Sequence, residues 1–241
     1  MGHTKKLNPV EAAKRFIHKY YPSCQGAVLA GSVVRGEETD TSDLDIVVFD
    51  QSIPSSYRES LIDFGWPIEV FVHNSTSYKH FFEMDFKAAK PSMQRMVFEG
   101  IILKDEGIIA SIKEEAKEIL EKGPERWTEQ LITTKRYFIT DALDDFIGCK
   151  NRAEDLFIAN TLAGLIHEFV LRINGRWTGS SKWVIRTLKN YDVEFTEEYV
   201  EAFDTFYKTG EKRKVIQLCE KVLDPYGGRL FEGFTLGKGD S

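Results

Sequence analysis

The stretch from Ala30 to Asp50 (AGSVVRGEETDTSDLDIVVFD) holds the residues best suited to chemistry. A strand-like run ends at Gly31-Ser32, and the residues after it can open a short helix. Free backbone N–H groups at the start of a helix bind anionic phosphates, and glycine lets the backbone approach a ligand closely. We therefore expect Gly31 and Ser32 to hold phosphate groups.

Asp43 and Asp45 follow about ten residues later, at the start of a second strand-like run. Residues two apart on a strand point to the same side, roughly 7 Å apart. Both carboxylates should therefore project together, while Leu44 and Ile46 face the core. Such carboxylates repel one another, and a divalent cation relieves the repulsion. Alone, Asp-x-Asp is also typical of a solvated strand end; beside a phosphate site it indicates Mg²⁺ holding a nucleoside triphosphate.

Glu69 is a third acidic candidate, within the run PIEVFVH. Alternation places it on the side opposite Ile68 and Val70, and a glutamate inside an apolar strand is costly without a partner. It could bind the metal or accept the proton of an attacking hydroxyl, or it could be an exposed residue of an edge strand. His73, on the same side, is interpreted as a surface residue at the strand end.

Gly-Ser followed about ten residues later by Asp-x-Asp resembles the nucleotidyltransferase superfamily that includes DNA polymerase β. Arg35-Gly36 between the two parts and Ser42 just before the first aspartate add to the resemblance, which covers roughly residues 26–73. It implies transfer of a nucleoside monophosphate, preferably AMP, from ATP or another nucleoside triphosphate to a hydroxyl group. It also implies that two Mg²⁺ ions take part. The implied metal ligands are Asp43, Asp45 and Glu69, and the implied nucleotide-binding residues are Gly31, Ser32, Arg35 and Ser42.

Asp141 and Asp145 lie one turn apart in the expected helix 126–148, away from its apolar side. They could belong to a solvated face. They could instead form an acidic wall that binds an amine-bearing substrate or deprotonates its hydroxyl. We retain both residues as candidate substrate-binding groups.

Lys182 lies in the unusual loop NGRWTGSSKW. Ser180 or Ser181 is expected to cap the next helix, which leaves the lysine in its first turn. A lysine there opposes the helix dipole unless an anion lies nearby. The segment resembles the TG-x-x-K stretch of aminoglycoside adenylyltransferases, which implies that Lys182 reaches the nucleotide phosphates; otherwise it is an ordinary surface lysine.

The elements that must position these residues fall into two halves. A helix from Asn8-Pro9 to Pro22 precedes strand-like runs at 26–30, 44–49 and 68–72, whereas 57–64 could be a strand or a short helix. The pattern turns helical after Ser75 and stays so through Phe86, and the apolar run at 101–104 could add an edge strand. Helices are then expected at 108–122, 126–148, 154–174, 181–189, 196–207 and 211–222. We expect an α/β nucleotidyltransferase domain with a mixed sheet (1–105) followed by an all-α helical bundle that binds substrate (106–241).

The composition narrows the classes of partner. An apolar content of 42% with 12% aromatic residues suits a folded, soluble protein. A net charge of −6 with a pI near 5.5 disfavours nucleic acid as a binding partner. The N-terminal residues lack the apolar region of a secretory signal, and no apolar run approaches the roughly 18 residues of a membrane helix. The three cysteines have no disulfide or zinc spacing. We expect a cytoplasmic protein, a monomer or a homodimer, without nucleic-acid or membrane partners.

The two-part layout resembles antibiotic nucleotidyltransferases of the aminoglycoside and lincosamide type. This resemblance implies a small-molecule acceptor and a role in antibiotic resistance. Two alternatives stay open: transfer of AMP to a protein, as in toxin–antitoxin systems, and a sensor that binds nucleotide without turnover.

Overall fold

The computed structural model describes residues 6–238, in two compact units that divide between Gly123 and Pro124. The expected boundary near 105 differs from this division because the helix α4 (Ile109–Lys122) packs on the sheet of the first unit. Residues 1–5 and 239–241, which the predicted domains include, lie outside the described residues.

The first unit is built on the predicted mixed sheet, whose strand order is β3-β4-β2-β1-β5. The strands are β1 (Gly26–Ala30), β2 (Leu44–Phe49), β3 (Tyr57–Asp63), β4 (Trp66–His73) and β5 (Ile101–Asp105). β2 and β4 are parallel, and the other neighbours are antiparallel. The segment whose type was left open is thus an edge strand, β3, and the expected edge strand at 101–104 is β5.

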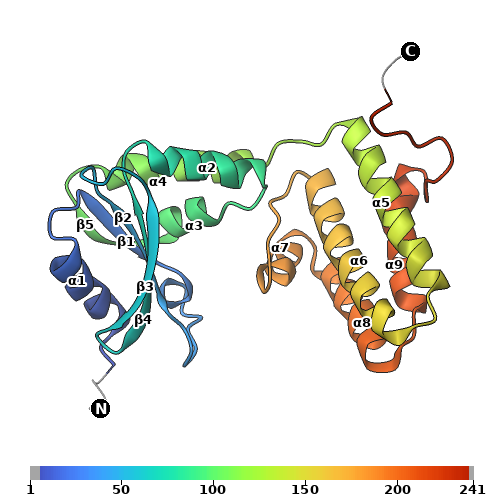
Figure 1. Cartoon of the computed structure of the whole chain (residues 1–241), viewed down its shortest axis with the longest axis horizontal. Helices are drawn as coiled ribbons and strands as arrows, with labels where there is room; N and C mark the ends of the chain where they lie inside the picture. The colour runs from blue at the N-terminus through green and yellow to red at the C-terminus, as the bar shows by residue number, and fades with distance from the viewer. Residues whose placement is uncertain (1–5, 239–241) are drawn as a thin grey trace. The chain divides into compact units, whose positions relative to one another are not determined.

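Helices cover both faces of this sheet (Figure 1). The helix α1 (Pro9–Tyr20) begins as expected, because the side chain of Asn8 accepts a hydrogen bond from the backbone N–H of Val10 at 3.1 Å and proline occupies the first turn. It packs Phe16 and Ile17 against the side of β2 that carries Leu44, Ile46 and Val48. The opposite side meets α2 (Ser77–Lys87), α3 (Ser92–Glu99) and α4. Alternation along β2 therefore sends Asp45 toward the α2–α4 face.

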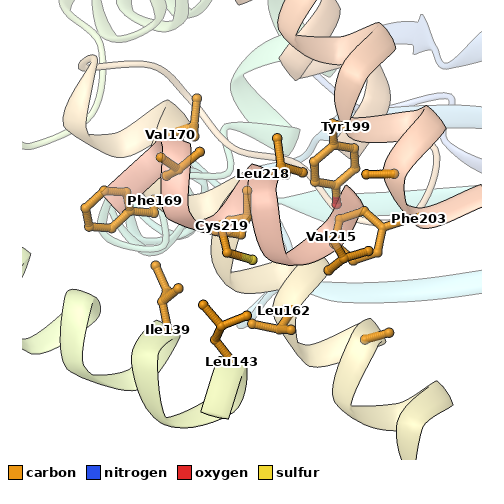
Figure 2. Close-up of a cluster of buried hydrophobic side chains, with 14 of the residues drawn as sticks. Ile139, Leu143, Leu162, Phe169, Val170, Tyr199, Phe203, Val215, Leu218 and Cys219 are labelled. Carbon is orange, nitrogen blue, oxygen red and sulfur yellow. The ribbon is translucent and has the colours of Figure 1, made fainter. Parts of the chain in front are cut away.

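The second unit is all helical, as predicted. It contains α5 (Glu129–Gly148), α6 (Arg152–Ile173), α7 (Trp183–Tyr191), α8 (Val193–Thr209) and α9 (Arg213–Leu223). Figure 2 shows their shared core, where Leu143 and Leu162 lie below Leu218 and Cys219. Among the described residues, α6 is the one helix long and apolar enough to cross a membrane by length and composition. It packs against α5, α7, α8 and α9, and the core helix of a bundle has the same properties.

Candidate active site

The three acidic side chains singled out in the sequence lie together on the first unit. Asp45 on β2 and Glu69 on β4 are direct partners in the parallel pair, and Asp43 immediately precedes β2. One carboxylate oxygen from each residue lies within 4.8 Å of the others. Oxygen ligands on opposite sides of Mg²⁺ are about 4.2 Å apart, since each Mg–O bond is about 2.1 Å. Small rotations of these half-buried side chains would therefore let the cluster fit a divalent cation.

Electrostatics support the same interpretation of Asp45. Burial first, and then the negative charges of Asp43 and Glu69, raise the pKa of its carboxyl from 3.8 to about 6. The guanidinium groups of Arg58 and Arg35 act in the opposite direction but do not cancel the effect. Ionised Asp45 is therefore held at a free-energy cost, which a bound cation would remove.

Gly31 is required by its contact with Asp45. It follows Ala30, which pairs with Asp45 across β1 and β2, and its φ of +81° is one that other residues rarely adopt. A Cβ built on Gly31 would collide with the Oδ2 atom of Asp45. The glycine thus lets the backbone turn directly over the Asp45 carboxylate.

The residues after Gly31 form a shorter turn than expected. Ser32, Val33 and Val34 make a single 3₁₀ turn because the N–H groups of Arg35 and Glu37 both donate to the Ser32 carbonyl. A turn of three residues has a weaker dipole than the predicted helix.

The nearby polar residues hold the loop closed. The buried Ser32 donates a hydrogen bond from its Oγ to the Ser42 Oγ at 3.2 Å, so these two candidate nucleotide-binding serines are in contact. Arg35, proposed for the nucleotide, forms ion pairs with Glu37 at 3.1 Å and with Glu99 at 3.0 Å. In this arrangement Arg35 ties the loop to the end of α3.

Arg58 is a member of the site that the sequence analysis missed. Its guanidinium donates to the Oε2 atom of Glu69 and lies over the Phe71 ring, 4.9 Å from the centroid. The Glu69 carboxylate raises the pKa of Arg58 through this hydrogen bond. Because β3 pairs with β4 in an antiparallel register, Arg58 reaches the same side of the sheet as Glu69.

His73 is not the surface residue expected. It is 3% exposed, and its Nδ1 lies 2.9 Å from the Ser56 Oγ. Burial lowers the pKa of its imidazole to about 4. The residue is therefore neutral at physiological pH.

The remaining candidates belong to the second unit. Lys182 is exposed and occupies the N-cap position of α7; neither Ser180 nor Ser181 caps the helix with its side chain, so the expected serine cap is wrong. The reason is backbone geometry, since Ser181 has a φ of +52° and the chain closes through hydrogen bonds to the Ser180 and Ser181 carbonyls. Asp141 and Asp145 are exposed on α5. Their proposed roles stay predictions.

Several solved protein structures are similar to this chain. A nucleotidyltransferase-like protein from Exiguobacterium sibiricum 255-15 is similar over 90% of this chain and 74% of its own, with a TM-score of 0.46 and 11% sequence identity. No family model matches the chain, and no curated protein matches it. Because the sequence identity and the TM-score are this low, any assignment of activity rests on the acidic cluster and its surroundings.

Proposed function

We propose that this protein is a Mg²⁺-dependent nucleotidyltransferase that moves a nucleoside monophosphate, AMP first among them, from a nucleoside triphosphate to a hydroxyl of a small molecule. The observation that carries the proposal is the Asp43–Asp45–Glu69 cluster, in which Asp45 lies against Gly31. An acidic cluster is common on protein surfaces, but here a half-buried carboxyl has a raised pKa and a glycine turn is packed against it. Those two features favour a site over a solvated strand end.

The proposed reaction is an in-line displacement at the α-phosphorus. The acceptor oxygen forms a bond to that phosphorus, the bond to the bridging oxygen of the β-phosphate breaks, and pyrophosphate leaves. Asp43 and Asp45 would hold the cation, which supplies charge neutralisation and alignment of the phosphates. Glu69 lies close enough to the same point to accept the acceptor's proton or to complete the metal ligands.

Positive charge near the cluster comes from two arginines of the first unit. Arg58 contacts Glu69 directly, and Arg35 lies beside the Ser32 turn within the ion pairs already described. Either could turn toward a triphosphate, because a guanidinium group binds the oxygens of a phosphate in the same geometry as it binds those of a carboxylate. Lys182 is proposed as a further phosphate contact, and Asp141 and Asp145 as contacts to the acceptor.

The finer assignments follow the resemblance of the two-part layout to antibiotic nucleotidyltransferases. We propose a cytoplasmic enzyme, monomeric or homodimeric, whose acceptor belongs to the hydroxyl-bearing antibiotics. Transfer to a protein hydroxyl is the second candidate. A nucleotide sensor without turnover is less favoured, since a binder gains nothing from repulsion among three carboxylates.

The test is transfer of label from α-³²P ATP with Mg²⁺, with release of pyrophosphate followed in parallel. Asp43→Asn should lower turnover by at least about a thousandfold while leaving the fold intact, because the amide is a poor ligand for Mg²⁺. Asp63→Asn, at the far end of β3, is the matched control and should turn over normally. Near-normal activity of Asp43→Asn would rule out the mechanism, and label on a protein instead of a small molecule would favour the second candidate.

A further inference from the structure

A pocket on the first unit lies next to the acidic cluster, and Arg58 is the one lining residue to which a role has been assigned so far. Its volume is about 440 Å³, within the range of roughly 300–1,000 Å³ typical of small-molecule sites. Val47 and Phe71 line it from the sheet, two residues further along β2 and β4 than Asp45 and Glu69. By strand alternation these four side chains point to the same side of the sheet.

The other walls come from β3 and from two helices. Phe81 on α2 and Met93 and Met96 on α3 line the side facing the sheet, and Tyr57 and Arg58 line it from β3. Arg58 belongs to both places, because its guanidinium contacts Glu69 while lying over the Phe71 ring. The pocket therefore adjoins the acidic cluster at this side chain.

The chemistry of the lining favours a neutral aromatic ligand. Aromatic and methionine side chains provide flat, polarizable contacts for a ring. Asp85 is the one carboxylate among the lining residues, and its Oδ2 already accepts the backbone N–H of Met93 at 2.8 Å. His73 at the other side is neutral, because burial holds its pKa near 4. A polycationic ligand would find little to pair with inside the pocket.

The order of the strands fixes which reactant the pocket would take. Gly31 and Ser32 follow β1, which borders β2 on one side, whereas the pocket lies toward β4 and β3 on the other. The acidic cluster on β2 and β4 separates the two. An in-line displacement needs the attacking hydroxyl and the leaving pyrophosphate on opposite sides of the α-phosphorus. With the triphosphate at the Gly31 turn, the pocket is on the side of the attacking hydroxyl.

We propose that this pocket binds the acceptor, and that the acceptor is a neutral, ring-bearing alcohol or phenol whose hydroxyl points toward Glu69. The assignment rests on the proposed nucleotidyl transfer and narrows its acceptor: it places the aromatic ring against Phe71 and Phe81. A polycationic aminoglycoside is thereby disfavoured as the substrate.

Methionine methyl groups give a direct test of binding that does not depend on turnover. The chain has four methionines: Met93 and Met96 line the pocket, whereas Met84 is 51% exposed on α2 and does not line it. In protein labelled with ¹³C at the methionine methyls, 2-naphthol should shift the Met93 and Met96 signals saturably and leave that of Met84 unchanged. Kanamycin should shift neither pocket signal.

Two variants and a control complete the experiment. Met96→Trp should fill the pocket, and Phe81→Ala should remove a wall; each should weaken 2-naphthol binding at least about tenfold, or about 1.4 kcal/mol. Phe98→Ala, a 42% exposed phenylalanine of α3 outside the pocket, should leave binding unchanged. Equal responses of all methionines, or unaltered affinity in both folded pocket variants, would overturn the pocket assignment.

The transfer assay then separates this inference from the proposed function. If label from ATP passes to 2-naphthol or related phenols in preference to kanamycin, the acceptor assignment holds. Transfer to kanamycin but not to phenols overturns the acceptor assignment and leaves nucleotidyl transfer standing. Absence of transfer to any acceptor, with 2-naphthol still bound, overturns nucleotidyl transfer and, with it, the role of the pocket as an acceptor site.

Discussion

Replacing Asp45 by asparagine should stabilise the protein when no metal is present. Asp45 is half-buried, and its pKa in the folded chain is about 6, against 3.8 without the fold. A carboxyl with a raised pKa binds more protons in the folded state, so the free energy of unfolding falls as pH rises from about 4 to about 6. A difference of about two pKa units corresponds to about 3 kcal/mol, an upper value because part of the surroundings can relax.

The asparagine side chain has the same shape and no charge, so Asp45→Asn should recover up to about 3 kcal/mol at about pH 7.5 in EDTA. At about pH 3, below both pKa values, the two proteins should be nearly equally stable, because Asp45 is then mostly protonated in the folded and in the unfolded state. Adding Mg²⁺ should stabilise the natural protein and not the variant, since only a binding-competent folded state gains from the ligand. Asp45→Asn should therefore both raise the stability in EDTA and abolish the stabilisation by Mg²⁺.

Hydrogen exchange of the β2 peptide, followed by mass spectrometry, measures the stability of the first unit separately from that of the second unit. Asp63→Asn is the control of opposite sign: the hydrogen bond from Lys19 lowers the pKa of Asp63, so neutralising it should weaken the fold slightly. If Asp45→Asn proves less stable than the natural protein at about pH 7.5 in EDTA, the electrostatic account of the cluster is wrong.

Three further outcomes are expected. Gly31→Ala should lower the free energy of unfolding by about 2 kcal/mol or more, seen in urea titrations, because of its φ of +81° and the collision with Asp45; an unchanged midpoint would refute the close contact. His73→Leu should flatten the loss of stability between pH 6.5 and about 4, worth up to about 3 kcal/mol, because a buried imidazole with a lowered pKa opposes folding as it becomes charged; an unaltered pH profile of thermal unfolding would contradict this. Lys182→Ala should raise the KM for ATP about tenfold with little effect on kcat, whereas Lys189→Ala, on the same helix, should change neither; equal effects would remove Lys182 from the site.

The catalytic candidates were predictable because their signals are local. Gly31-Ser32 and the two aspartates lie within one short stretch, and strand alternation alone puts Asp43 and Asp45 on one side. Glu69 could be found because an acidic residue interrupts a β-branched run. The strands carrying them form where expected, since β1 and β2 are short and almost wholly apolar.

Arg58 could not be found in this way because β3 is an exposed edge strand without alternating burial. Its register depends on the turn at Phe64 and Gly65, both of which have positive φ. Asn-Gly or Asp-Gly would have marked such a hairpin turn, but phenylalanine there conceals it.

Two other misses have similar causes. The helix α3 was not predicted because it is eight residues long and no side chain caps it. The two compact units divide after Gly123 and not near 105. Long-range packing decides whether an amphipathic helix such as α4 covers a sheet or joins a bundle, and one sequence does not display that packing.

The parallel pairing of β2 with β4 has a consequence for how the chain folds. β3 and β4 can form a hairpin early, because a two-residue turn joins them, and β1 meets β2 through a loop of modest length. Pairing β4 with β2 joins these two hairpins and closes a longer loop than either hairpin does. The same pairing brings Asp45 opposite Glu69. Like charges thus meet at the step that joins the two hairpins, whereas β5 pairs with β1 across a longer stretch of chain. We expect the acidic cluster to slow that late step, so that divalent cations accelerate refolding at neutral pH and the catalytic constellation is absent from every earlier intermediate.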